Sequence, residues 1–116
     1  MKDGARPRVF RNGEHKRDFV YVKDVVTLTI KALRSPKNNI YNCGSGHPVS
    51  FNEVIEELNK NLGTDLKPEY IDNPYAFYQP HTEARMLLAR QELGFEPAFT
   101  PITGIADYVK ILEGGE

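Results

Sequence analysis

The clearest pattern in the chain is an apolar helical stripe that begins at residue 51. Its members recur every three or four residues, as one face of a helix requires, and are Phe51, Val54, Ile55, Leu58 and Leu62. Ser50 and Glu53 have the spacing of a capping box, in which each side chain bonds the other residue's backbone N–H. Gly63 suits the left-handed position that ends a helix. The pattern predicts a helix over 51–62.

Three other stretches also favour helices. The pattern of Val25–Leu33 fits either a helix or a strand, and Asp24 as a possible N-cap favours a helix that ends before Ser35-Pro36. Thr82 can cap a helix that runs to Leu93 and closes at Gly94. Thr100-Pro101 pairs an N-cap with proline at the first helical position, ahead of a stripe formed by Ile102, Ile105, Ala106, Val109 and Leu112.

Short β-forming runs separate these helices. They are Arg8–Phe10, Phe19–Val22, Ile40–Cys43 and Leu66–Ile71, and Pro68 marks the last run as an edge strand. Asn12-Gly13 supplies the positive φ angles of a tight turn after the first run. Strands alternating with helices predict an α/β fold, and 116 residues predict one domain over 1–116.

Composition narrows the function classes. A net charge of -1 argues against nucleic acid and membrane surfaces as partners, and no apolar run is long enough to span a membrane. The single cysteine, Cys43, cannot form an intramolecular disulfide, which suits a reducing compartment such as the cytoplasm. The three histidines show no metal-ligand spacing. No acid–base or nucleophile constellation stands out, so the residues alone favour a binding unit over a catalyst.

The charge is concentrated at one end, because residues 1–17 carry six Lys or Arg and two acids. This basic segment is either a solvated arm or a site for an anionic ligand. Arg17 presents a planar fork of donors suited to phosphate, and its alternative role is an ion pair with Asp18 or Asp24. From the residues alone the two roles of Arg17 weigh equally.

Two further segments have open interpretations. Gly44-Ser45-Gly46 follows a β-forming run, but Val49 stands where a dinucleotide fingerprint has its third glycine, so a tight turn is favoured over phosphate binding. The loop over 72–80 holds Tyr75, Phe77 and Tyr78, which suit either the core or contact with a flat ligand.

Three motifs in order resemble the C-terminal part of extended short-chain dehydrogenases that act on nucleotide sugars, the NAD-dependent epimerases and dehydratases. They are Arg17-Asp18-Phe19-Val20-Tyr21-Val22-x-Asp24-Val25, then Ile40-Tyr41-Asn42-x-Gly44-x-Gly46 followed by Ser50-Phe51, and Leu93-Gly94-Phe95-x-Pro97 with the final helix. The stretch Tyr78-Gln79-Pro80-His81-Thr82-Glu83-Ala84 looks most like ADP-glyceromanno-heptose 6-epimerases. Arg85 departs from the Asp that the family usually has at the head of the next helix.

The resemblance implies particular roles. Phe10, Arg11, Asn12 and Gly13 would line the nucleotide-sugar site, Arg17 would contact the diphosphate, and Tyr78 would contact the sugar or its phosphate. Such enzymes use NAD or NADP to oxidise a sugar carbon to a ketone and return the hydride to its other face.

The chain lacks the family's cofactor-binding features. None of its tyrosines is followed four residues later by the lysine of the Tyr-x-x-x-Lys motif, and no complete glycine fingerprint occurs. We therefore expect the substrate-binding portion of an epimerase without its N-terminal Rossmann half: it would bind no cofactor and be inactive alone. Apolar surface left where that half belongs should lead to oligomers or to partial disorder. The alternatives are a UDP-hexose 4-epimerase, a nucleotide-sugar dehydratase or a free-standing ligand-binding module.

Overall fold

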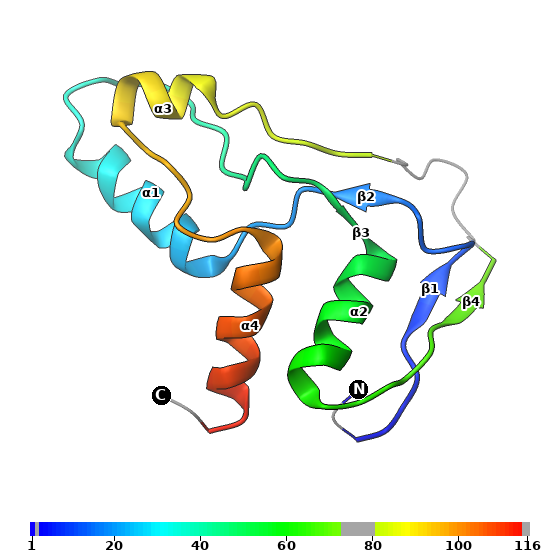
Figure 1. Cartoon of the computed structure of the whole chain (residues 1–116). Helices are drawn as coiled ribbons and strands as arrows, with labels where there is room; N and C mark the ends of the chain where they lie inside the picture. Colours follow the sequence, from blue (N-terminus) through cyan, green and yellow to red (C-terminus); the bar gives the residue numbers. More distant parts are fainter. Residues whose placement is uncertain (2, 73–80, 115–116) are drawn as a thin grey trace.

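The computed structural model describes residue 1 and residues 3–72 and 81–114. In these residues the strands and helices follow one another in the order β1 (Arg8–Phe10), β2 (Lys16–Arg17), α1 (Val22–Arg34), β3 (Val49–Ser50), α2 (Phe51–Leu62), β4 (Glu69–Ile71), α3 (Leu87–Leu93) and α4 (Pro101–Leu112). β1 pairs in parallel with β4, and β2 pairs antiparallel with β3 (Figure 1). The predicted α/β class is confirmed.

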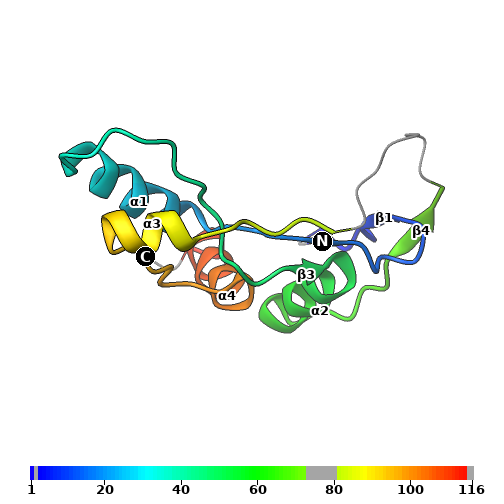
Figure 2. The ribbon, with the colours of Figure 1, turned by 90° about the horizontal axis from the view of Figure 1, so that it is seen from above.

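The molecule is a thin slab that measures 48 × 40 × 17 Å. Its radius of gyration is 16.4 Å, whereas a compact domain of this length has about 13 Å. In Figure 2 the elements spread sideways, with α1 and α3 at one end and β1 and β4 at the other. Because a helix with its side chains is about 10–12 Å across, much of the slab is a single layer of elements and shields little of its apolar surface.

The main core lies between α1 and α3. It consists of the buried side chains of Leu28, Met86, Ala89 and Phe95, and Phe95 is 0% exposed. Cys43 packs against this cluster, and burial raises the pKa of its thiol. The cysteine therefore serves as a small packing residue. Within the described residues, no helix combines the length and the apolar character needed to cross a membrane.

The helices with complete sequence signals form as predicted. Glu53 N–H donates to Ser50 Oγ at 3.1 Å and Ser50 N–H donates to Glu53 Oε1 at 3.3 Å, so the capping box of α2 is present. Gly63 closes α2 at φ +69°. At α4, Thr100 and Thr103 form a second capping box, and Pro101, between them, takes the first helical position.

The predicted N-cap of α1 was wrong. The helix begins at Val22, so Asp24 lies within its first turn, where it is 2% exposed. Its carboxylate accepts hydrogen bonds from the N–H groups of Ala98 and Phe99, at 2.9 and 3.1 Å. Asp24 therefore joins α1 to the segment before α4, and sequence alone could not show this long-range bond.

The predicted start of α3 was also wrong, since the helix begins at Leu87 and not after Thr82. The N–H of Thr82 donates to Lys16 O at 3.2 Å, and the N–H of Ala84 donates to Asp18 Oδ2 at 2.8 Å. These bonds across the slab place residues 81–84 alongside β2, so the segment cannot form the first turns of a helix.

Two predicted strands do not form ladders in the described part of the chain. In the Phe19–Val22 run, the ring of Phe19 packs against Phe51 and the ring of Tyr21 packs against Phe99. The paired strand in this part of the chain, β2, ends before the run, at Arg17. The Ile40–Cys43 run has no paired strand, and Ile40 is 87% exposed. The fourth strand forms but is shorter than predicted, because Leu66 N–H donates to Asn59 Oδ1 at the end of α2.

Helix α3 begins without a side-chain cap, and Arg85 precedes its first turn. Because a cation at a helix N-terminus opposes the helix dipole, Arg85→Asp should raise the free energy of unfolding by about 0.3–1 kcal/mol. Urea denaturation would measure this change, with Arg85→Ala as the control that removes the cation without adding an anion. An Arg85→Asp protein no more stable than the Arg85→Ala protein would contradict the prediction.

Candidate functional site

The turn after β1 is held against the start of α2. Gly13 N–H donates to Phe10 O at 3.1 Å, and Asn52 N–H donates to Gly13 O at 3.0 Å. Arg11 and Gly13 both have positive φ, +55° and +72°. A Cβ at Gly13 would overlap the side-chain amide of Asn52, so only glycine fits there. The structure therefore makes Gly13 essential to the shape of the predicted substrate-contacting turn.

Arg17 ends β2 and its guanidinium lies over the ring of Phe51, 5.7 Å from the ring centroid. Its Nη1 donates to Lys16 O at 2.8 Å. Phe19 packs edge-on against the same ring, with centroids 5.8 Å apart. The ring of Phe51, the first residue of α2, thus contacts both Arg17 at the end of β2 and Phe19 just after it.

A cavity of about 150 Å³ connects this region to β1. Its lining residues are Arg8, Val9, Phe10 and Phe51. Ligand pockets for small molecules usually measure about 300–1,000 Å³, so this hollow accounts for only part of a nucleotide site. Phe51 lines the hollow together with Phe10 and also lies under the guanidinium of Arg17, so one aromatic residue links the hollow to Arg17.

The rest of the basic segment has a mixed role. Arg6 donates to the carbonyls of Lys67 and Pro68 at 2.8 and 3.0 Å, and Arg8 Nε lies 3.9 Å from a carboxylate oxygen of Glu69. These two arginines therefore help to hold the chain around β4 beside β1. Tyr78, the last predicted site residue, lies outside the described residues, as do Tyr75 and Phe77.

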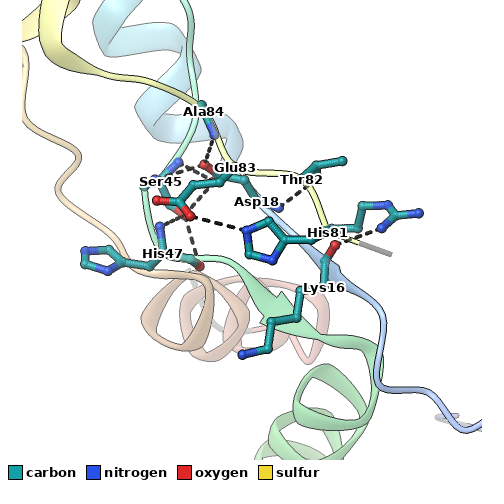
Figure 3. A network of polar contacts seen from close by, with 10 residues as sticks. Lys16, Asp18, Ser45, His47, His81, Thr82, Glu83 and Ala84 are labelled. Carbon is teal, nitrogen blue, oxygen red and sulfur yellow. Dashed lines mark hydrogen bonds and ion pairs between the residues drawn. The ribbon is translucent and has the colours of Figure 1, made fainter. Parts of the chain in front are cut away.

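Asp18 is the centre of the polar network in Figure 3. Its carboxylate accepts hydrogen bonds from Ser45 N–H at 2.6 Å, Ser45 Oγ at 2.7 Å, Gly46 N–H at 3.0 Å and Ala84 N–H at 2.8 Å. Burial opposes its charge, but these hydrogen bonds together lower the pKa of Asp18. One carboxylate thus joins the residue after Arg17 to two segments distant in sequence.

This network also decides the role of the Gly44-Ser45-Gly46 loop. The N–H groups of Ser45 and Gly46 are bound to Asp18, and a Cβ at Gly44 would overlap Ala84 and Asp18. The loop therefore does not fit the pyrophosphate of a dinucleotide. Gly44 allows close approach of Asp18 and Ala84, and Gly46 takes a positive φ of +74°, which agrees with the predicted turn.

A larger cavity of about 940 Å³ lies beside this loop, between residues 81–90 and the start of α4. Of the predicted site residues that the structure describes, which are residues 10–13 and Arg17, none lines it. Its walls carry a contact of His81 Nε2 with Glu83 Oε1 at 3.3 Å and an ion pair of Arg90 with Glu96 at 2.5 Å. Among the described residues, no group of acids, histidines and cysteine is arranged to bind a metal ion.

Sequence reasoning missed Phe51 and Asn52 as parts of the site. Phe51 was assigned to the apolar stripe of α2, and Asn52 carries no motif. A signal was available for Phe51, because Ser50-Phe51 follows the second motif of the family resemblance, but its contact with Arg17 depends on the pairing of β2 with β3. Asn52 could be assigned only once the turn had been located.

Comparison with known proteins identifies the relatives of the chain. The model of the NAD dependent epimerase/dehydratase family matches residues 1–44. The chain is 34% identical over 119 aligned positions to the ADP-L-glycero-D-manno-heptose-6-epimerase of Brachyspira hyodysenteriae, covering 97% of this chain and 37% of that protein. This chain is a relative of the NAD-dependent epimerases and dehydratases. The resemblance predicted from its motifs is confirmed.

Solved structures of epimerases share the fold. The ADP-L-glycero-D-manno-heptose-6-epimerase of Helicobacter pylori superposes with a TM-score of 0.84 and 35% identity, over 93% of this chain and 33% of that one. The UDP-glucose 4-epimerase of Thermotoga maritima, solved with UDP-glucose, superposes with a TM-score of 0.89 and 28% identity, over 98% of this chain and 37% of that one. The chain thus spans little more than a third of the length of these epimerases.

Proposed function

We propose that this chain is the substrate-binding portion of a nucleotide-sugar epimerase, most like ADP-glyceromanno-heptose 6-epimerase. The observation that carries the proposal is the 34% identity to such an epimerase over 97% of the chain. The geometry supports it, because Phe10 and Phe51 line one hollow, the guanidinium of Arg17 lies over the ring of Phe51, and Asn52 N–H holds the turn of residues 10–13 at the start of α2. The activity belongs to a cytoplasmic parent enzyme of which the chain is a part.

The proposed roles divide the ligand between two groups of residues. Phe10, Arg11, Asn12 and Gly13 line the nucleotide, and the guanidinium of Arg17 binds the diphosphate with its fork of donors. Tyr78 contacts the sugar or its phosphate. The parent uses NAD or NADP, which supplies oxidation and reduction at the sugar carbon, and this chain alone binds neither.

The partner of the chain is the N-terminal Rossmann half of the parent. The apolar face of α1 is the proposed docking surface, and its exposed residues are Val22, Val26, Ile30 and Leu33. An apolar groove of about 440 Å³ between residues 19–22 and α4 adjoins this face at Val22. Two observations support the Rossmann half as the partner. The molecule is a thin slab that leaves this apolar face exposed, and the chain spans 37% of the length of its relative, so the rest of the parent is available to cover the face.

The isolated chain should self-associate through the α1 face, because the apolar residues have no other cover. Light scattering should report oligomers, and the double substitution Val26→Lys with Ile30→Lys should shift the population towards monomer. Thr27→Lys, which adds a charge to the same helix outside the apolar face, serves as the control. A compact monomer before any substitution would contradict this prediction.

The experiment that tests the fragment proposal is to sequence the coding DNA upstream of Met1. The proposal predicts an in-frame extension that encodes a glycine-rich βα turn and a Tyr-x-x-x-Lys motif. The isolated chain should show no epimerisation of ADP-heptose with either cofactor. A stop codon next to a ribosome-binding site just before Met1 would favour a free-standing ligand-binding module.

A UDP-hexose 4-epimerase is the second candidate, since the structure of the Thermotoga maritima UDP-glucose 4-epimerase has the higher TM-score of the two. A nucleotide-sugar dehydratase is a further alternative. Competition binding to the parent distinguishes the nucleotides: protection by ADP supports the heptose epimerase, and protection by UDP alone supports the second candidate.

A further inference from the structure

Asn52 occupies the second position of α2, directly after Phe51. Its side-chain Nδ2 donates to Asn12 O at 2.7 Å and to Glu14 Oε1 at 2.6 Å. Its Oδ1 accepts a hydrogen bond from Tyr70 Oη at 2.9 Å. A single amide group therefore binds both sides of the turn and also the strand β4, using both of its N–H donors and its acceptor.

Asn52 also determines the backbone of the turn. Its N–H donates to Gly13 O at 3.0 Å, and its side chain occupies the space that a Cβ at Gly13 would need. The carbonyls of Asn12 and Gly13 thus both accept hydrogen bonds from Asn52. They lie on either side of the Gly13 Cα, where the Asn52 side chain leaves no room for a Cβ. The conformation of the turn follows from where α2 places Asn52.

We propose that Asn52 is a positioning residue that holds the turn of residues 10–13 in the geometry for binding the nucleoside part of a nucleotide sugar. The proposal rests on the proposed function of the turn. Phe51, the preceding residue, lies under the guanidinium of Arg17. The first two residues of α2 therefore locate the nucleoside-contacting turn and the diphosphate-contacting arginine relative to each other.

The test separates the two parts of the ligand by using two probes, ADP and inorganic pyrophosphate, in NMR titrations of the whole chain. Asn52→Asp keeps the shape and the acceptor for Tyr70, removes both N–H donors and places a second carboxylate beside Glu14. It should weaken ADP binding about tenfold, as the loss of two hydrogen bonds implies, and change pyrophosphate binding less than about twofold. Asn52→Ala, which adds no repulsion, should give the same pattern.

A rescue and a matched control complete the design. Glu14→Gln added to Asn52→Asp supplies an amide that can donate to the new carboxylate, so it should restore part of the ADP affinity. Asn61→Asp removes a similar amide on the same helix, where Nδ2 of Asn61 donates to Glu57, and should leave both probes unaffected.

Unchanged ADP binding in both Asn52 variants would overturn the proposal. Equal weakening of ADP and pyrophosphate would also overturn it, because the residue would then support the fold in general. The unsubstituted chain tests the proposed function separately: if it binds pyrophosphate but not ADP, the assignment of the turn fails, and the role of Asn52 fails with it.

Discussion

Replacing Asp18 with asparagine is expected to lower the free energy of unfolding by about 3 kcal/mol, although the two side chains have the same shape. An amide can accept hydrogen bonds on its oxygen alone, and its NH₂ group would face the N–H donors of Ser45, Gly46 or Ala84. At least one backbone donor would lose its partner, and the remaining bonds would lose the strength that the charge adds. Urea denaturation at pH 7 measures the loss.

The same substitution has a predicted pH dependence. The pKa of Asp18 in the folded protein is lowered, so its stabilisation is complete above the ordinary aspartate pKa of about 3.9 and is lost as the pH falls through the lower folded value. The difference in stability between the original protein and Asp18→Asn should therefore shrink in strong acid. Asp65→Asn, at an exposed position, is the control. A difference that is equal at pH 7 and in strong acid would contradict this role for the charge.

Replacing Arg17 with alanine is expected to weaken nucleotide-sugar binding by the parent by about 1.5–3 kcal/mol, the range for a hydrogen bond to a charged group. Arg17→Lys should recover only part of the loss, because lysine lacks the planar fork that binds a diphosphate through two donors. The free energy of unfolding should change less than the free energy of binding. The reason is that the contact of Arg17 with Phe51 is a partly exposed cation–π pair, which contributes about 0.5–1 kcal/mol.

The measurement for Arg17 is a binding titration with ADP and the nucleotide sugar. Arg34→Ala, an exposed arginine in the last turn of α1, controls for the loss of one positive charge. If both Arg17 variants bind as tightly as the original protein, Arg17 has a structural role and does not bind the diphosphate.

The sequence predicted those elements whose signals are complete within a few residues. Ser50 with Glu53 and Thr100 with Pro101 located the starts of α2 and α4, because a cap, its partner and the apolar stripe lie close together in the chain. The starts of α1 and α3 were misplaced, because bonds with distant residues determine them. Asp24 resembles a cap but binds Ala98 and Phe99, and the backbone of Thr82 and Ala84 binds residues 16 and 18.

The candidate site shows the same division. The family resemblance identified the turn of residues 10–13 and Arg17, since these belong to or adjoin contiguous motifs. It gave no site role to Phe51 or Asn52, because their contacts join segments about 35–40 positions apart. It also did not show that Asp18 binds the amides of Ser45 and Gly46. These contacts depend on the pairing of β2 with β3, which has only two residue pairs and no sequence signal of its own.

The most direct test of the central claim is to locate ADP on the chain by NMR, with UDP in a parallel titration. We predict saturable shifts of the backbone amides of Phe10, Arg11, Asn12, Gly13 and Arg17, larger for ADP than for UDP at equal concentration. Shifts confined to the cavity between residues 81–90 and α4, or no saturable shift with either nucleotide, would contradict the claim that this chain carries the nucleotide-binding part of an epimerase.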